Sequence, residues 1–430
     1  MALMNPSHSC RSTRPPLPVL VLVLVLMLIP ALVPGCARVD PDAPSFQIIE
    51  EEGIPVAETI NGPLDKAPLF TCEQVLVLRE DPARPESMLF NPRSFSYGPD
   101  GSYYVGDDGN YRIAVFDSEG HFRKSIGREG GGPGEFRYMT LQCLRGDTLS
   151  IFDYTQQRTT WYRTDGTLLA TMPSPNGRLT TRFDRSADGI WILEGVSSNR
   201  RSAGPSVTRR RLVMLEPAGE DTLGVVEVGR EPNMLILTFQ TLEGGGTAMS
   251  ATSLPFAGSH DVTWVPGRGI LASDGNIQRL AWYDLTGEPT LIIRPGMPDR
   301  PVTAEMRDVF LDRLRASRRE REAELGRSLG PLPEYSFAEQ VGFWSRTTVD
   351  DAGWIWLLDA RDSALHEEGE PWLHHVISTR GEYLGTALLP ATRFVIRDGR
   401  LMALITDPET GEVRPTVFRL IPAVAGLDYP

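Results

Sequence analysis

The sequence predicts an all-β fold, a six-bladed β-propeller of four-stranded blades with a helical insertion between blades 4 and 5. Two observations lead to this prediction. Short runs of β-branched and aromatic residues, which favour strands, alternate with turns that contain Gly or Asp. These turns fall into two interleaved series, and three of the five intervals within the first series are 42 to 47 residues long. Such a spacing is typical of a propeller blade with four strands.

Each blade has four strands, a to d, and contains one turn of each series. A turn of the first series joins strands a and b, a longer link joins b and c, and a turn of the second series joins c and d. The a–b turns are Asp100-Gly101, Gly146-Asp147, Asp188-Gly189, Gly267-Arg268-Gly269, Asp351-Ala352-Gly353 and Asp398-Gly399. The c–d turns are Glu119-Gly120, Asp165-Gly166, Ala218-Gly219, Thr286-Gly287 and Arg380-Gly381. Six a–b turns predict six blades over residues 72–421, and the missing sixth c–d turn predicts that the last blade lacks a strand. The apolar run 72–79 is expected to supply that strand and close the ring, which removes an exposed sheet edge.

Blade 1 carries a family resemblance. The stretch from Pro99 to Gly120 resembles an NHL repeat. The stretch from Ile126 to Phe136 resembles the loop that leaves a blade in bacterial six-bladed, NHL-like propeller lipoproteins. The likeness is specific in this blade and extends to the others only through the repeat. It implies the fold, and no site residue of propeller enzymes is matched well enough to be carried over.

The first 35 residues predict a signal peptide. They contain Arg11 and Arg14 and no acidic residue, followed by an apolar run over 17–29 that is too short to span a membrane. The segment that ends in Gly35-Cys36 resembles a bacterial lipobox, which implies cleavage before Cys36 and attachment of a lipid such as palmitate to its thiol. Cleavage of an ordinary signal peptide is the alternative.

The expected mature chain begins with a tether and ends with a tail. Residues 36–71 are rich in Pro and acidic residues without clear periodicity, so we expect a tether that lifts the propeller off a membrane. Residues 422–430 are expected to be a C-terminal tail. Cys72 and Cys143 are expected not to form a disulfide, because the predicted blade order puts blade 1 between them.

Composition and motifs exclude several functions. The chain has 56 acidic and 43 basic residues and a net charge of −13, so nucleic-acid binding is not expected. Residues 127–134 are rich in Gly but lack the Lys-Ser/Thr pair and the helix of a phosphate-binding loop, so we interpret them as a blade-to-blade link. No His pair has the spacing of a local metal motif. We predict no cofactor and no metal.

An acidic residue recurs where strand b ends, and in three blades an Arg follows it five positions later. The pairs are Asp107 and Arg112, Asp153 and Arg158, and Asp274 and Arg279. One hypothesis is a ring of carboxylates that holds a metal in the central channel. Repetition favours the structural hypothesis, in which each Arg pairs with its Asp or with a neighbouring blade.

The long excursions all fall in the b–c and d–a links, which lie on one side of a propeller, here named the long-loop face. The largest, about 297–343, predicts a helix over 304–325 with Thr303 as N-cap and Gly326 as C-cap. Because loops on a rigid scaffold usually carry binding functions, this face is the candidate binding surface. Its candidate residues are Arg200, Arg201, Arg209, Arg210, Arg211, His260 and His366.

Two functions remain open. The sequence favours an exported, membrane-tethered binding or scaffold module in the cell envelope. A lipid anchor would hold it to the cell membrane or outer membrane, facing the periplasm or the exterior. Its ligand would be a protein or a small molecule. The alternative is a metal-dependent propeller enzyme of the lyase or lactonase/hydrolase type, with calcium or zinc in the central channel.

Overall fold

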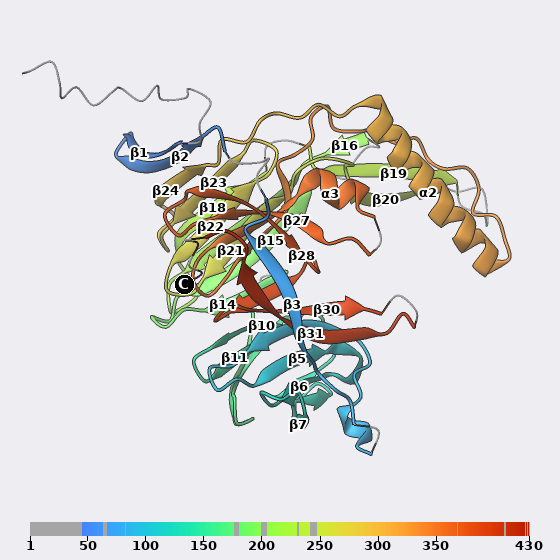
Figure 1. Ribbon diagram of the computed structural model, residues 1–430. Helices are drawn as coiled ribbons and strands as arrows, with labels where there is room; N and C mark the ends of the chain where they lie inside the picture. Colours follow the sequence, from blue (N-terminus) through green and yellow to red (C-terminus); the bar gives the residue numbers. More distant parts are fainter. Residues whose placement is uncertain are drawn as a thin grey trace, which may run out of the picture. The chain divides into compact units, whose positions relative to one another are not determined.

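The computed structural model describes the chain from residue 45 onward, with short gaps. The described residues are 45–62, 67–81, 83–175, 180–198, 204–229, 232–240, 247–367, 369–407, 410–425, 427 and 429. The predicted signal peptide, Cys36, Arg200 and Arg201 lie outside them. Strands dominate this part of the chain (Figure 1). None of its helices is long and apolar enough to span a membrane.

Six sheets form the blades of a β-propeller, so the predicted all-β, six-bladed fold is confirmed. Within each blade, neighbouring strands are antiparallel and run in the order a, b, c, d. Blade 1 is β4 (Pro92–Tyr97), β5 (Tyr103–Asp107), β6 (Arg112–Phe116) and β7 (Phe122–Ile126), and blade 2 is β10 (Met139–Arg145), β11 (Thr148–Asp153), β12 (Arg158–Arg163) and β13 (Leu168–Pro173). Blade 3 is β14 (Arg182–Arg185), β15 (Trp191–Ser198), β17 (Thr208–Leu215) and β18 (Thr222–Val228), and blade 4 contains β21 (His260–Val265), β22 (Gly269–Asp274), β23 (Arg279–Tyr283) and β24 (Pro289–Arg294). Blade 5 is β25 (Trp344–Val349), β26 (Ile355–Asp359), β27 (Trp372–Ile377) and β28 (Tyr383–Leu389), and blade 6 is β29 (Phe394–Arg397), β30 (Arg400–Thr406), β31 (Val413–Pro422) and β3 (Phe70–Val77).

The expected closing strand is present. β3 pairs antiparallel with β31, from Phe70 opposite Pro422 to Val77 opposite Thr416, and it begins two residues earlier than predicted. Blade 6 also meets blade 1, where a guanidinium nitrogen of Arg397 donates to the carbonyl of Tyr97 at 3.0 Å. The two ends of the propeller are therefore joined in one sheet, and the ring is closed.

The closing strand and the C-terminal segment also meet in the core between blades 5 and 6. Tyr429, from the predicted tail, packs edge-on against Phe70 and Trp354, with ring centroids 5.8 and 5.4 Å apart. Its hydroxyl donates to Asp350 at 2.7 Å. Cys72 in β3 is a free cysteine, and burial raises the pKa of its thiol to about 11.

The prediction of an irregular tether through residue 71 is wrong for residues 45–60. β1 (Ser45–Glu51) and β2 (Ile54–Ile60) form a hairpin, and β2 pairs parallel with β24, so that blade 4 has six strands. Thr59 Oγ1 accepts the backbone N–H of Tyr383 in blade 5 at 3.0 Å. The run of glutamates at 50–52 hides the strand pattern in the sequence, and the partner strand lies more than 200 residues away.

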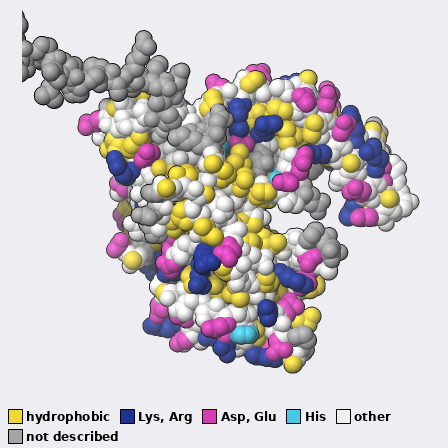
Figure 2. Space-filling view, viewed as in Figure 1, with side chains coloured by type: hydrophobic (Ala, Val, Ile, Leu, Met, Phe, Trp, Pro, Cys, Tyr) yellow, Lys and Arg dark blue, Asp and Glu magenta, His cyan; other side chains and the backbone are white. Residues whose placement is uncertain are grey.

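The helical insertion between blades 4 and 5 is confirmed. α2 spans Ala304–Leu325, the Thr303 side chain accepts from the N–H of Met306 at 3.2 Å, and Gly326 ends the helix with φ of 63°. Phe310 packs on Phe256, but no residue of the helix is buried. The remainder of α2 projects away from the blades, and basic and acidic side chains alternate along it (Figure 2).

Two further elements enlarge the long-loop face. One is a small sheet of β16 (Gly204–Ser206), β19 (Met234–Gln240) and β20 (Thr247–Ser253), which extends from blade 3. The other is the short helix α3 (Ala360–Leu365) in the b–c link of blade 5. Smaller elements in the remaining links are η1 (Pro85–Ser87), η2 (Asp108–Asn110), β8 (Arg128–Glu129) and β9 (Glu135–Phe136).

Large buried side chains fill the space between the blades. Trp344 of blade 5 is fully buried, and its indole N–H donates to Ser273 of blade 4 at 2.7 Å. Trp356 of blade 5 packs edge-on against Phe394 of blade 6, with ring centroids 6.2 Å apart. Because each blade is held by packing against its neighbours, the strand starts around the channel form a rigid frame.

Candidate functional site

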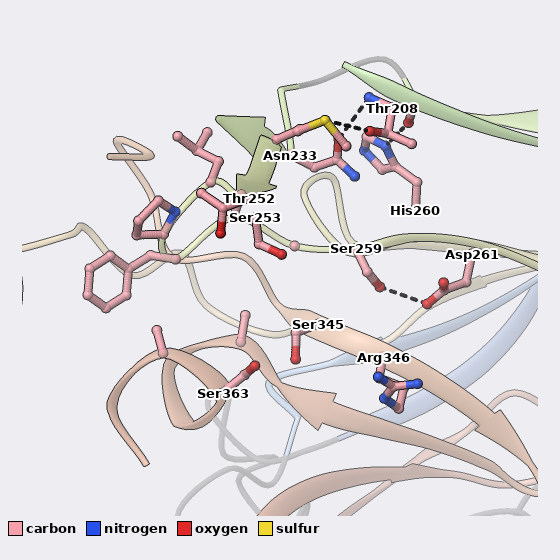
Figure 3. A pocket seen from close by; sticks show the side chains of 18 of the residues that line it. Thr208, Asn233, Thr252, Ser253, Ser259, His260, Asp261, Ser345, Arg346 and Ser363 are labelled. Atoms are coloured by element: carbon pink, nitrogen blue, oxygen red, sulfur yellow. Dashed lines mark hydrogen bonds between the residues drawn. The ribbon is translucent and has the colours of Figure 1, made fainter. Parts of the chain in front are cut away.

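A pocket of about 500 Å³ lies on the long-loop face between blades 3, 4 and 5 (Figure 3). Its charged residues are Arg210, Asp261 and Arg346. Hydroxyl and amide side chains make up much of the remaining lining. They are Thr208, Asn233, Thr252, Ser253, Ser259, Ser345 and Ser363.

Both the blades and the insertions build this pocket. The first residues of β21 and β25, the a strands of blades 4 and 5, form one part of the lining, and the start of β17 forms another. The walls come from β20, from Phe310 of α2 and from α3. A strand a begins where the d–a link ends, so its first residues lie on the long-loop face. The predicted long excursions therefore surround one cavity.

Arg210 is a predicted arginine that the structure places in the pocket. Its guanidinium donates to Glu194 at 3.1 Å and lies 3.8 Å from Asp261. Asp261 also accepts the hydroxyl of Ser259 at 2.8 Å. The charge of Arg210 is therefore compensated by two carboxylates.

Arg346 faces the same pocket without such compensation, and sequence reasoning missed it. Among the described residues, no carboxylate lies within 4 Å of its guanidinium, and it makes no hydrogen bond. Burial lowers the pKa of Arg346, and the charges of Arg393 and Arg210 lower it further, while Asp261 acts in the opposite direction. In Figure 3, Arg346 and Asp261 lie across a gap from each other. The pocket thus contains a partly desolvated cation that no carboxylate of the described residues approaches within 4 Å.

His260 is among the residues that line the pocket, but its side chain is buried. Nδ1 donates to the carbonyl of Thr208 at 2.8 Å, and Nε2 lies 3.4 Å from Asp274 and 3.0 Å from the side-chain nitrogen of Asn276. Burial opposes protonation, but Asp274, the carbonyl of Thr208 and Asp261 together outweigh it and raise the pKa of His260. The imidazole joins Thr208 of blade 3 to Asp274 of blade 4. His260 therefore stabilises the contact between these two blades.

The other described candidates of the binding face do not converge on the pocket. His366 stacks on Trp372, with ring centroids 3.4 Å apart, and its carbonyl accepts from Arg313 of α2 at 2.6 Å. Arg209 and Arg211 are exposed on β17. Arg209 lines a separate hollow between blades 3 and 4 together with Arg279, which is a different surface from the pocket.

Of the three repeated Asp–Arg pairs, only the pair in blade 1 is an ion pair. Asp107 Oδ2 accepts from Nε and Nη2 of Arg112, both at 3.2 Å. In blade 2 the expected pair is absent, because Arg158 donates instead to the carbonyls of Gly132 and Glu135 at 2.6 Å. In blade 4 it is absent as well, because Asp274 turns to His260 and to the backbone N–H of Asn276, and Arg279 is exposed.

Asp107 and Asp153 share a structural role, although the ion pair is missing in blade 2. Asp107 accepts the backbone N–H groups of Phe90 and Asn91 at 2.9 and 3.0 Å, and Asp153 accepts that of Arg137 at 2.7 Å. These N–H groups belong to the segment that leads into strand a. Each carboxylate therefore binds the incoming d–a link to the end of strand b, which agrees with the structural hypothesis.

Within the described residues, three possible metal ligands come together only at Asp117, Glu119 and His121, whose ligand atoms lie within 4.8 Å of one another. This group lies at the c–d turn of blade 1. It is mostly exposed, and the topology puts it on the face opposite the pocket.

Comparison with known proteins agrees with this architecture. Residues 97–172, which run from the end of strand a in blade 1 to strand d of blade 2, match the model of the DUF5128 family, described as a 6-bladed beta-propeller. The chain is a six-bladed β-propeller. No curated protein matches the sequence.

Solved structures with the same type of fold are distant from this propeller. A protein from Bacteroides fragilis that is described as exported is 12% identical, with a TM-score of 0.46, and the match covers 85% of this chain and 99% of that one. Virginiamycin B lyase from Staphylococcus aureus is 9% identical, with a TM-score of 0.34, over 77% of this chain and 81% of the lyase. The calcium-binding protein regucalcin from Agrobacterium tumefaciens is 12% identical, with a TM-score of 0.35, over 82% and 95%. With TM-scores below 0.5, none of these likenesses indicates what this propeller does.

Proposed function

We propose that this propeller is an exported binding module, anchored through Cys36, whose pocket on the long-loop face holds a small polar ligand. One observation carries the proposal. Residues from three separate insertions, β20, α2 and α3, meet over the first residues of β21 and β25 and leave a cavity of about 500 Å³ between them. That volume lies in the range of small-molecule sites.

The lining of the pocket supports a ligand rather than a purely structural role. Insertions that only braced the blades would be expected to meet in an apolar core, because filled apolar interfaces are stable. Phe256, which also lines the pocket, forms such a core with Val302 and Val341. The pocket itself presents Ser253 and Ser345 together with charged side chains. Polar groups on rigid strands can orient a ligand at little entropic cost.

Native mass spectrometry of the chain purified from its host tests the proposal. We expect a co-purifying small molecule on the wild type and its loss in Ser345→Trp, because the indole fills the cavity. Ser118→Trp, on the c–d turn of blade 1, is the matched control and should retain the molecule. Equal occupancy of the wild type and Ser345→Trp would show that the ligand binds elsewhere.

Two further measurements test the remaining parts of the proposal. Cys36→Ser should move the protein from the detergent phase to the aqueous phase and remove the mass of the lipid, whereas Cys72→Ser should change neither. Elemental mass spectrometry of chelator-free protein separates the binding module from the metal-dependent enzyme. One calcium or zinc per chain would favour the enzyme.

A further inference from the structure

We infer that the ligand of this pocket carries an oxyanion, a carboxylate or a phosphate ester, which Arg346 and Arg393 of neighbouring blades bind together. The inference rests on the proposed function and adds the chemical class of the ligand. It follows from the positions of arginines at the starts of the a strands and from the surroundings of Arg346.

An arginine stands within two residues of the start of strand a in five of the six blades. In blades 1 to 3 and in blades 5 and 6 they are Arg93, Arg137, Arg182, Arg346 and Arg393, whereas blade 4 has Asp261 near this place. All a strands begin on the long-loop face, around the mouth of the channel. These arginines therefore recur at one end of the blades, in a chain with a net charge of −13.

The register of the sheets brings Arg346 to the side of blade 5 that faces blade 6. Arg346 is paired with Leu358, and Leu358 is paired with His374, so these three side chains share one face of the sheet. The His374 ring packs edge-on against Phe394, with centroids 5.2 Å apart. Arg393 directly precedes Phe394. The two guanidinium groups therefore belong to adjacent strand starts.

Neither arginine has a partner within the described part of the chain. Arg393 is exposed and makes no ion pair or hydrogen bond there. Asp261 is the acid whose charge acts on Arg346, but it is already engaged by Arg210 and Ser259. Arg393 is not among the residues that line the pocket, but its charge and that of Arg210 act on Arg346. Like charges that act on a partly buried cation are costly unless an anion joins them.

The arginine of blade 1 differs in its surroundings. Arg93 donates to the hydroxyl of Tyr138 at 2.7 Å and lies 3.8 Å from Asp108. Its guanidinium is also 5.6 Å from the centre of the Tyr138 ring. Because this arginine already has partners, it is less available to an anion than Arg346 and Arg393.

Guanidinium chemistry defines the ligand group. The planar fork of Arg donates two parallel hydrogen bonds to carboxylate or phosphate oxygens, which a neutral hydroxyl cannot match. The neighbouring Ser345 and Ser363 hydroxyls are suited to the polar remainder of the ligand. A hydroxylated carboxylic acid or a phosphorylated small molecule fits both parts of the pocket.

Calorimetric titration of the full chain with citrate, glucuronate, glucose 6-phosphate and glucose tests this inference. We expect at least one of the three anions to bind, with an affinity that falls as salt is added, and no binding of glucose. Arg346→Gln and Arg393→Gln should each weaken anion binding by about tenfold or more. Arg315→Gln on the exposed part of α2 should leave it unchanged.

A second readout does not depend on the choice of probe. Removing an uncompensated, partly buried charge should raise the Tm of the free chain, so Arg346→Gln is expected to melt about 2 °C higher than the wild type. It should also abolish the rise in Tm that the bound anion causes. Arg346→Lys keeps the charge but lacks the planar fork, and we expect it to bind the anion weakly.

Failure of the inference is distinguishable from failure of the proposed function. If glucose binds as tightly as the anions, or if none of the anions binds, the oxyanion inference is wrong. The comparison of wild type with Ser345→Trp then still decides whether the pocket holds a ligand. If the anions bind but Arg346→Gln binds them equally well, another part of the chain holds them and the inference is again overturned.

Discussion

Arg300, from the insertion that follows blade 4, donates to Asp359 of blade 5 at 2.8 Å. The carboxylate is almost fully buried and also accepts from Nε2 of His375 at 2.9 Å. His375 in turn contacts the hydroxyl of Tyr383 at 3.0 Å through Nδ1. One buried acid thus fastens the insertion that carries α2 to the blade that carries Arg346.

Arg300→Met should destabilise the fold, because it leaves the buried Asp359 without its cationic partner. We expect a loss of about 2–3 kcal/mol in the free energy of unfolding, measured by urea denaturation. Arg315→Met breaks an exposed ion pair with Asp312 and should cost less than about 0.5 kcal/mol. Equal effects of the two substitutions would contradict the assignment of Asp359 as the anchor of the insertion.

His374 predicts acid sensitivity of the fold. Burial lowers its pKa to about 3, and the nearby charges of His375 and Arg346 act in the same direction, whereas Asp359 opposes them. His374 is therefore protonated below about pH 6.5 in the unfolded chain, but only below about pH 3 in the folded chain. Stability should fall as the pH drops through this window, by at most about 1.4 kcal/mol per pH unit from this residue. Unfolding free energies at several pH values should show a shallower fall in His374→Phe, and an unchanged fall in the exposed-site control His121→Phe.

His260 predicts the opposite pH dependence. Its pKa is raised in the fold by Asp274 against the effect of burial, so the protonated form is favoured there. The resulting stabilisation is fully present below the unfolded pKa near 6.5 and is lost as the pH rises through the higher folded pKa. His260→Gln should therefore cost more stability at pH 6 than at pH 9. If the difference in unfolding free energy between wild type and variant does not change with pH, this prediction is wrong.

A cross-strand disulfide should lock the ring. Glu73 of β3 and Arg419 of β31 are directly opposite, exposed and joined by an ion pair. In a Cys72→Ala background, Glu73→Cys with Arg419→Cys should form a bond on oxidation and stabilise the fold by about 2–4 kcal/mol. The measurement is the difference in Tm with and without reductant. A bond that forms without raising the Tm would mean that β3 does not control opening of the ring.

Local sequence signals predicted the parts of the structure that depend on local interactions. Thr303 and Gly326 cap α2 through contacts within a few residues, so the helix boundaries could be predicted from the sequence. The closing strand was predictable because the blade repeat left a defined gap for it. The hairpin at 45–60 was missed because its partner β24 is remote in sequence, and pattern alone does not identify a remote partner.

The candidate site depended on neighbours from other blades, and the sequence predicted it less well. A fixed spacing of five residues predicted three equivalent Asp–Arg pairs. Arg158 instead donates to carbonyl groups of the preceding link, and Asp274 contacts His260. Arg346 carries no motif, and its significance comes from which charges surround it. Arg recurs near the starts of the a strands, and this recurrence could have pointed to Arg346. It can be recognised only when the strand boundaries are known.

The hairpin β1–β2 determines how a pulling force enters the molecule. From residue 45 the chain passes through the β1–β2 and β2–β24 ladders before it reaches β3. Tension from the N-terminal side therefore loads blade 4 first, and the strand that closes the ring is loaded only after the hairpin has detached. For a propeller anchored through Cys36, as we propose, the hairpin would act as a sacrificial element that protects the shape of the pocket under mechanical stress.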